Sequence, residues 1–293
     1  MKRNIGTIGA LLIMATLSLA WPTIGRASAD FDQSKEISVI SREDGSGTRG
    51  AFIELFGIEQ KSKDGGKKDL TTKEAVIAKQ TDVMMTNIAA DRYAIGYISL
   101  GSLNATVKAV AIDGATASAE NVKDGSYPVA RPFFIATKDE QSEATSDFIA
   151  FILSAQGQEI VGKHYIAAHT NAHAYQPGGQ KTGKVTIAGS SSVTPVMEKL
   201  REGYLALNPE AVIEIQQSDS SAGLSAAISG ICDIGMASRA LKESEARALK
   251  PVQIAIDGIA VIVNPENPAL NLSKEQVRQI FTGQERHWSG VIR

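Results

Sequence analysis

Residues 37–52 read ISVISREDGSGTRGAF and combine three structural signals in sixteen positions. The β-branched run from Ile37 to Ser41 is typical of a buried strand. Arg42 to Arg49 then form a polar, glycine-containing loop, and apolar residues at helical spacing begin at Ala51 and Phe52. Strand, loop and helix in this order are the repeating unit of α/β folds. The stretch therefore predicts an α/β protein with a functional loop at a strand end.

Two more polar turns stand between an expected strand and an expected helix. They are Gly189 to Ser192 (GSSS) and Ser218 to Gly223 (SDSSAG). Unpaired N–H groups and the positive dipole end at a helix N-terminus favour an anion, and serine hydroxyls add further donors. Each turn alone is better explained as a helix cap. Three such turns, one of them with an arginine, predict a local anion-binding site.

The rest of the chain alternates strand-like and helix-like patterns in two series. Residues 171–184 (NAHAYQPGGQKTGK) separate the series and have the proline and glycine content of a linker. In the first series, apolar spacing predicts one helix over 146–163, and in the second, AIDGIAVIVN at 255–264 is the strongest strand pattern. Such alternation favours largely parallel sheets whose ligands lie at the carboxyl ends of strands.

The composition limits the class of protein. The 293 residues are 43% hydrophobic and 21% charged, which suits two globular domains and excludes disorder, coiled coil and collagen. A formal charge of −2 provides no general field for nucleic acid or an anionic membrane. A single cysteine, Cys232, cannot close an intramolecular disulfide or form a zinc site by itself.

Residues 1–29 have the features of a secretory signal peptide. Lys2 and Arg3 precede an apolar run over 5–20, and Ala27 to Ala29 supply small residues for cleavage. A membrane anchor is the alternative, although the run is interrupted at several positions: Gly6, Gly9, Thr16 and Pro22. No cysteine follows the run, so a lipid-anchored form is not expected. We expect a periplasmic or secreted protein.

Four segments resemble a known family. VTIAGSSSVTPVMEKL at 185–200, SDSSAGLSAAISGICDIGMASRAL at 218–241 and AIDGIAVIVNPENP at 255–268 resemble the amino-terminal half of the phosphate-binding proteins that serve phosphate ABC transporters. The segment that starts at residue 37 and continues to PFFIATK at 132–138 resembles the carboxyl-terminal half of that family. The two halves come in reversed order. The resemblance thus implies a two-lobe type II periplasmic-binding-protein fold in circularly permuted form, with the ligand cleft between the lobes.

A permutation predicts the division of the chain. After the signal peptide, residues 30–130 together with 257–293 would form the lobe that carries the REDGSGTR loop. Residues 131–256 would form the second lobe, in which the linker 171–184 bridges the usual termini. Such a rearrangement is tolerated because domain termini commonly lie close together at the surface. A truncated tandem copy is the alternative.

The resemblance also implies which residues hold the ligand. Ser191 would bind through its hydroxyl and Ser192 through its N–H group, and Asp44 would orient the arginine. The loops of the two lobes would clasp phosphate with neutral donors and one guanidinium fork. The remaining residues implied in binding are Arg42, Ser46, Gly47, Thr48 and Ser220.

One position departs from the family pattern. Ser238 stands where many members carry the aspartate that accepts the proton of hydrogen phosphate, which leaves the rejection of sulfate open. Asp219 or Asp257 could replace that acceptor, and each could equally be an ordinary loop or strand-end residue. Arg239 is a second candidate cation, with a surface salt bridge as its alternative role.

Other motifs point to different functions and are weaker. Gly45 to Gly50 fits GxGxxG, but the charged residues that precede it are unlike a dinucleotide-binding turn. GGQKTGK at 178–184 lacks the Ser or Thr of a Walker A loop. His164, His169 and His173 have no accompanying carboxylate, so no metal site is expected. No GxSxG elbow supports a serine hydrolase.

The sequence therefore predicts a monomeric protein that binds inorganic phosphate for the permease of an ABC phosphate importer. We expect no catalysis, cofactor, metal or nucleic-acid partner. The alternative from another class is a secreted phosphatase or other hydrolase, or another oxyanion-binding protein, that uses the same loops. A sensing or adhesion protein on the same fold is a third interpretation.

Overall fold

The structure is a computed structural model that describes residues 31–61, 67–176 and 183–292. The expected signal peptide 1–29 and the middle of the expected linker lie outside the described residues. From Phe31 onward the chain forms one unit of mutually contacting elements. No helix in the described ranges is long and apolar enough to cross a membrane.

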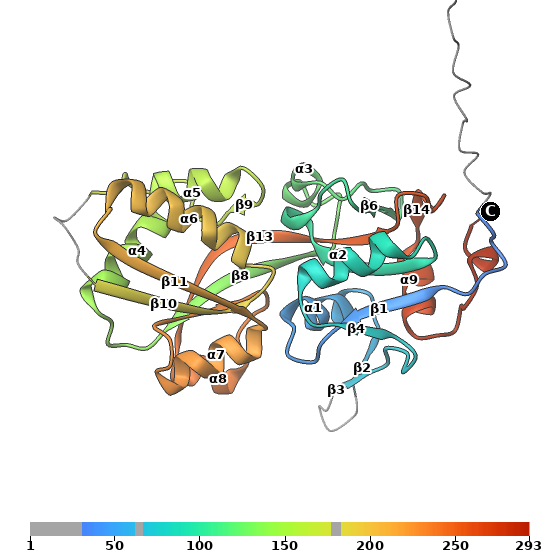
Figure 1. Cartoon of the computed structure of the whole chain (residues 1–293), viewed down its shortest axis with the longest axis horizontal. Helices are drawn as coiled ribbons and strands as arrows, with labels where there is room; N and C mark the ends of the chain where they lie inside the picture. Colours follow the sequence, from blue (N-terminus) through green and yellow to red (C-terminus); the bar gives the residue numbers. More distant parts are fainter. Residues whose placement is uncertain (1–30, 62–66, 177–182, 293) are drawn as a thin grey trace, which may run out of the picture. The chain divides into compact units, whose positions relative to one another are not determined.

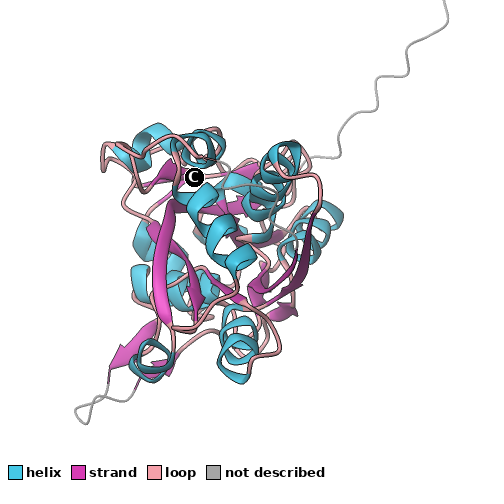
Figure 2. Cartoon of the chain, turned by 90° about the vertical axis from the view of Figure 1, so that its left-hand side faces the viewer, coloured by secondary structure: helices cyan, strands magenta, loops and turns pink. Residues whose placement is uncertain are grey.

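The described elements alternate between strands and helices throughout, and helices flank the strands on both sides (Figure 2). Up to the linker they are β1 (Ser38–Arg42), α1 (Gly47–Leu55), β2 (Glu59–Lys61), β3 (Lys67–Asp69), β4 (Val76–Ala78), α2 (Thr81–Ala90), β5 (Ala94–Ser99), β6 (Lys108–Ala109), β7 (Ala111–Ile112), α3 (Ala119–Lys123), β8 (Ala130–Thr137), α4 (Glu143–Leu153), α5 (Ala155–Gly162) and β9 (Ile166–Ala167). After it they are β10 (Gly183–Ser190), α6 (Thr194–Leu207), β11 (Ala211–Ser218), α7 (Ser220–Ser229), β12 (Ile234–Ala237), α8 (Glu243–Ala248), β13 (Lys250–Val263), β14 (Asn271–Leu272) and α9 (Lys274–Phe281). Short 3-10 helices occupy Leu100–Ser102 and Trp288–Gly290. The α/β class predicted from the sequence is confirmed.

The main sheet has the strand order β11-β10-β12-β8-β13-β5-β1-β4. The strands at each end pair in parallel, as the alternation predicted: β10 with β11 and β12, and β1 with β4 and β5. The middle pairs are antiparallel, because β8 and β13 run past each other between the two ends. β13 pairs with β8 through its first half and with β5 through its second half (Figure 1). This one strand therefore joins both ends of the sheet.

Two hydrophobic cores lie on either side of this crossing. The first contains buried side chains from Ile37 to Val129 and from Ile259 to Val291. The second contains buried side chains from Phe133 to Ala255, with a smaller cluster around Leu224. On β8 and on β13, only a few residues separate the side chains that pack in one core from those that pack in the other. The division into lobes at 130 and 257 stays a prediction, which this distribution of apolar residues supports.

The two ends of the described chain lie side by side. The N–H group of Ser289 donates a hydrogen bond of 2.7 Å to the carbonyl of Gln33, and that of Trp288 bonds the carbonyl of Lys35 at 3.3 Å. The rings of Phe31 and Trp288 are 5.9 Å apart, and Trp288 is fully buried. The ends are thus fixed to each other by backbone hydrogen bonds and by aromatic packing.

The sequence patterns missed two local features. The single helix expected over 146–163 is broken into α4 and α5, because Ser154 caps the second of them by accepting from the N–H of Gly157 at 3.2 Å. A Cβ at Gly157 would lie 2.2 Å from the carbonyl oxygen of Phe151, so the turn requires glycine. The short strands β2, β3 and β4 were not expected, since three-residue strands leave no clear periodicity.

Candidate functional site

The carboxyl end of β1 places Arg42 in the interior, where its side chain is 2% exposed. The Tyr97 hydroxyl of β5 accepts a hydrogen bond of 3.1 Å from the Arg42 N–H group and bonds Ser41 Oγ at 2.8 Å. The Tyr97 ring stacks on Phe52 of α1 with a centroid separation of 3.8 Å. Burial raises the pKa of Tyr97, so its hydroxyl stays protonated and able to donate. β1, β5 and α1 together fix the backbone of the arginine.

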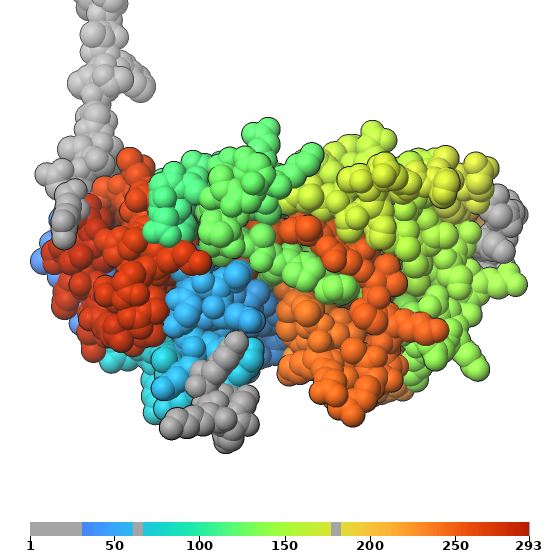
Figure 3. Space-filling model, turned by 180° about the vertical axis from the view of Figure 1, so that it is seen from behind, coloured from blue at the N-terminus to red at the C-terminus, as the bar shows by residue number. Residues whose placement is uncertain are grey.

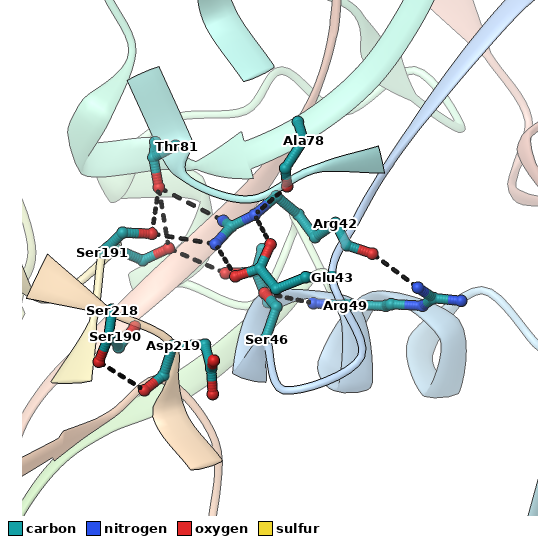
Figure 4. A network of polar contacts seen from close by, with 12 residues as sticks. Arg42, Glu43, Ser46, Arg49, Ala78, Thr81, Ser190, Ser191, Ser218 and Asp219 are labelled. Carbon is teal, nitrogen blue, oxygen red and sulfur yellow. Dashed lines mark hydrogen bonds and ion pairs between the residues drawn. The ribbon is translucent and has the colours of Figure 1, made fainter. Parts of the chain in front are cut away.

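The guanidinium of Arg42 is the centre of a polar network (Figure 4). Its Nε and Nη2 donate to the two carboxylate oxygens of Glu43 at 2.8 and 2.7 Å. Nη2 also donates to Ser191 Oγ at 3.0 Å, and Nη1 to Thr81 Oγ1 at 3.4 Å. Ser191 follows β10, which packs in the second core, whereas the other members belong to elements of the first. The arginine therefore joins the two sides of the crossing.

The prediction that Asp44 orients the guanidinium of Arg42 was wrong. Asp44 does not contact Arg42: its side chain is 96% exposed and pairs with Arg49 Nη1 at 2.9 Å. The cause is the local turn, in which Ser46 caps α1 by accepting from the Arg49 N–H group at 3.3 Å and so turns Asp44 outward. The adjacent carboxylate, Glu43, orients the guanidinium instead and is 16% exposed.

A second hydrogen bond joins the same loops. Thr48 Oγ1, in the first turn of α1, lies 2.8 Å from Ser192 Oγ. Thr81 Oγ1, the first residue of α2, lies 3.2 Å from Ser191 Oγ and 3.5 Å from Ser192 Oγ. All four hydroxyl side chains are buried. The expected residues Arg42 and Thr48 are thus brought together with Ser191 and Ser192, as the cleft hypothesis requires.

Gly47 makes a third contact between the loops. A Cβ on Gly47 would lie 2.6 Å from Ser220 Oγ and 2.7 Å from Ser238 Oγ. Nearby, the Ser221 N–H group donates to the carbonyl of Gly45 at 3.3 Å. Figure 3 shows the surface of the α1 region in blue directly beside the orange surface of α7 and α8. The N-termini of α1 and α7, each the positive end of a helix dipole, therefore meet at this point.

Ser238 takes part in a small network of serines. Its Oγ accepts from Ser190 Oγ at 3.0 Å, and its N–H group donates to Ser220 Oγ at 3.1 Å. Ser190 and Ser220 are buried as well. The serine that replaces the family's aspartate therefore lies among the expected binding residues.

The two candidate replacement acceptors and the second candidate cation have separate roles in the structure. Asp219 caps α7 by accepting from Ala222 N–H at 2.8 Å. Asp257 is buried and pairs with Arg131 at 3.2 Å. Arg239 forms a two-pronged pair with Glu245 at 2.8 and 2.9 Å, a largely buried salt bridge where the alternative considered was a surface one.

Sequence reasoning missed Glu43, Thr81 and Ser190. Glu43 adjoins the expected arginine, so its position in the same loop was an available signal. Thr81 follows the unexpected strand β4, and no signal in the sequence marked it. In the described part of the chain, no group of His, Cys, Asp and Glu could hold a metal ion.

The arrangement suits an oxyanion. Buried hydroxyls, backbone N–H groups at two helix N-termini and one guanidinium converge from both sides of the crossing, and such donors complement a tetrahedral anion. Among the described members of this network there is no histidine or cysteine beside a hydroxyl, which is the pairing that activates a nucleophile.

The comparisons with known proteins agree with this chemistry. A family model described as a PBP superfamily domain matches residues 8–156 and 174–291. A protein of Streptococcus agalactiae named phosphate-binding protein PstS 2 is 53% identical over 257 residues, which cover 87% of each chain. The phosphate-binding protein PstS of Bacillus subtilis is 36% identical over 110 residues, 36% of this chain.

A solved structure matches over nearly its full length. The crystal structure described as a phosphate-binding protein of a phosphate ABC transporter from Streptococcus pneumoniae is 45% identical, with a TM-score of 0.68. The match covers 87% of this chain and 99% of that one. The mixed α/β architecture is therefore that of a two-lobe periplasmic binding protein, and the chain belongs to the PstS phosphate-binding proteins of the PBP superfamily.

Proposed function

We propose that this chain binds inorganic phosphate as the extracytoplasmic solute-binding component of an ABC phosphate importer. The observation that carries the proposal is the direct meeting of the Arg42–Thr48 loop with Ser191 and Ser192 across the crossing strands. The printed names of its relatives, phosphate-binding proteins, support it. Delivery to a membrane permease is part of this proposal, as are export to the periplasm or cell exterior and the absence of catalysis.

In the proposed site, phosphate replaces the direct contacts between the loops. Arg42 supplies the guanidinium fork, held by Glu43. Ser191, Ser192 and Thr48 supply hydroxyl or N–H donors that bond one another in this structure. The remaining donors come from Ser46, Gly47, Ser220 and Ser238. Opening and closing would occur at β8 and β13, which carry the chain between the two cores.

Titration calorimetry with phosphate, sulfate and arsenate tests the function. We expect phosphate to bind with a dissociation constant of about 1 μM or tighter, or about −8 kcal/mol. Phosphate esters should stay intact in a parallel assay. Hydrolysis of the esters would favour the secreted phosphatase, and tighter binding of sulfate would favour another oxyanion-binding protein.

We also propose that the chain is a circular permutant of the shorter-matching PstS proteins and that it is a monomer. The adjacent chain ends support this, because a permutation opens the fold where the new ends stay close. The match to PstS 2 covers 87% of this chain, whereas the match to PstS of Bacillus subtilis covers 36%. This difference fits a chain that shares the order of its two halves with PstS 2 but not with PstS of Bacillus subtilis. Both cores and the shared strand β13 lie within one chain, which a truncated tandem copy would not require.

Restoring the other order tests the permutation. A variant that runs from residue 183 to 292, continues through a short glycine–serine linker and then runs from 31 to 176 should fold as a monomer. Light scattering gives its mass, and calorimetry should give phosphate affinity within about threefold of the parent chain, because the contacts are the same. Aggregation, or assembly into a dimer that alone binds phosphate, would contradict the permutation.

A further inference from the structure

A buried ion pair lies where the chain passes from one core to the other. Arg131 on β8 and Asp257 on β13 face each other in register, with 3.2 Å between Nη2 and Oδ2. Their side chains are 2% and 1% exposed. The first core ends at Val129, just before β8, and the second begins at Phe133 on β8. The pair therefore stands at the boundary that any movement between the cores must involve.

Arg131 is incompletely paired. Its Nε and Nη1 are buried and have no hydrogen-bond partner among the residues described. The Phe133 ring lies 5.4 Å from the guanidinium carbon and offers a weak cation–π contact. A buried cation with free N–H groups is unfavourable unless nearby negative charge offsets it. Asp257 supplies one such charge and leaves two nitrogens available.

The strand register places Arg131 close to the anion site. Phe134 of β8 faces Ala237 of β12, so the next residue along β12, Ser238, is level with Phe133. Arg131 is two residues from Phe133, which is about 7 Å along a strand. The backbone of Arg131 is therefore about two residues along β8 from the level of Ser238, which belongs to the serine network that the proposed site uses.

The charges of the two arginines act on each other. Burial lowers the pKa of Arg131, Asp257 raises it, and the positive charge of Arg42 lowers it further. Such mutual influence requires that the two guanidinium groups share one electrostatic environment. An anion held by Arg42 would then be attracted by Arg131 as well.

We propose that Arg131 is a second, buried cation behind the anion site and that Asp257 offsets its charge. This inference rests on the proposed phosphate binding. It assigns both residues an electrostatic role in affinity, in addition to any structural role in the crossing strands.

The charge behind the site then depends on pH. Burial raises the pKa of Asp257 to about 6, against the opposing effect of Arg131. The other groups that face the pair are Tyr165, whose pKa burial raises, the Gly101 N–H group, which bonds Asp257 at 3.3 Å, and the neutral hydroxyl of Ser99. Arginines stay charged throughout. Well above pH 6 the pair has no net charge, and well below it the protonation of Asp257 leaves the positive charge of Arg131 without an offset.

The Asp257→Asn variant isolates this effect. Phosphate changes its own protonation with pH, but the ratio of the wild-type to the variant dissociation constant cancels that change. At about pH 7.5 the variant should bind about tenfold tighter, because it lacks the negative charge that offsets Arg131. At about pH 5 Asp257 is protonated in the wild type, so the ratio should approach unity. Glu214→Gln, which removes an exposed carboxylate paired with Lys184, is the control and should leave both values unchanged.

A double variant in which both side chains are neutral tests the proposal if Asp257→Asn fails to fold. The Arg131→Gln/Asp257→Asn variant keeps hydrogen bonding without charge and should match the wild type at about pH 7.5. At about pH 5 it should bind about tenfold more weakly, because the wild type alone gains the charge of Arg131. Thermal unfolding confirms that each variant is folded before titration.

The outcomes separate the two proposals. If the wild type binds phosphate and either variant shows its expected pH-dependent ratio, the inference is supported. Ratios near unity at both pH values, or equal changes at both, would show a purely structural role and overturn it. A wild type that binds no phosphate at either pH would instead overturn the proposed function itself.

Discussion

Replacing Arg42 with methionine should abolish tight phosphate binding. The guanidinium is buried and contributes a side-chain cation that contacts both Glu43 and Ser191. Removing one member of a buried charged contact costs about 3–5 kcal/mol, and each 1.4 kcal/mol is about tenfold in affinity, so we expect a loss of at least about a hundredfold. Calorimetry with phosphate measures this loss directly.

A second substitution separates binding from folding. Arg42→Met leaves the Glu43 carboxylate buried without its partner, which lowers stability by itself. The Arg42→Met/Glu43→Gln variant removes that charge, so its thermal unfolding should recover most of the lost stability while binding stays absent. Arg278→Met, which removes a partly exposed arginine paired with Glu275, is the control and should alter neither property. Retained affinity in the double variant would show that Arg42 does not hold the anion.

Gly47→Ala should weaken phosphate binding about tenfold to a hundredfold while the protein stays folded. The new methyl group would lie 2.6 Å from Ser220 Oγ and 2.7 Å from Ser238 Oγ, and overpacking of this kind costs about 1–3 kcal/mol. The loops sit between the cores, so they can relieve the clash by moving apart, which prevents closure on the ligand. Small-angle scattering should accordingly show no compaction when phosphate is added.

Gly50 of the same helix offers a matched control. Neither Gly47 nor Gly50 has a positive φ, and a Cβ at Gly50 would have no neighbouring atom within 4 Å. Gly50→Ala should keep full affinity and gain up to about 1 kcal/mol of stability from better helix propensity. Equal losses of affinity in both variants would mean that the effect comes from α1 as a whole and not from the contact between the loops.

The sequence predicted those parts of the site that depend on local pattern. The strand, loop and helix around Arg42 follow from short-range periodicity, and the serine turns follow from the same signal. The choice of Glu43 over Asp44 depends on how Ser46 caps α1, which a spacing argument does not resolve. Thr81 was missed because β4, which precedes it, is three residues long and has two exposed apolar side chains.

Long-range pairs were out of reach for a similar reason. Arg131 and Asp257 are separated by 126 positions, and their contact depends on the antiparallel register of β8 and β13. The expected alternation favoured parallel sheets, which is correct only for the outer strands. The hydrophobic pattern of a strand shows which of its residues are buried, but not which strand pairs with it. The antiparallel pairing of β8 with β13 could therefore be inferred from family resemblance but not from periodicity.

The chain order also determines when a working site can exist during synthesis. Arg42 emerges early, but its partner Ser191 follows 149 residues later, and α7 later still. A nascent chain therefore displays the arginine loop long before the serines that complete it. Contacts so distant along the chain are formed slowly, because a large loop must close first. Capture of an ion must accordingly await release of nearly the whole polypeptide.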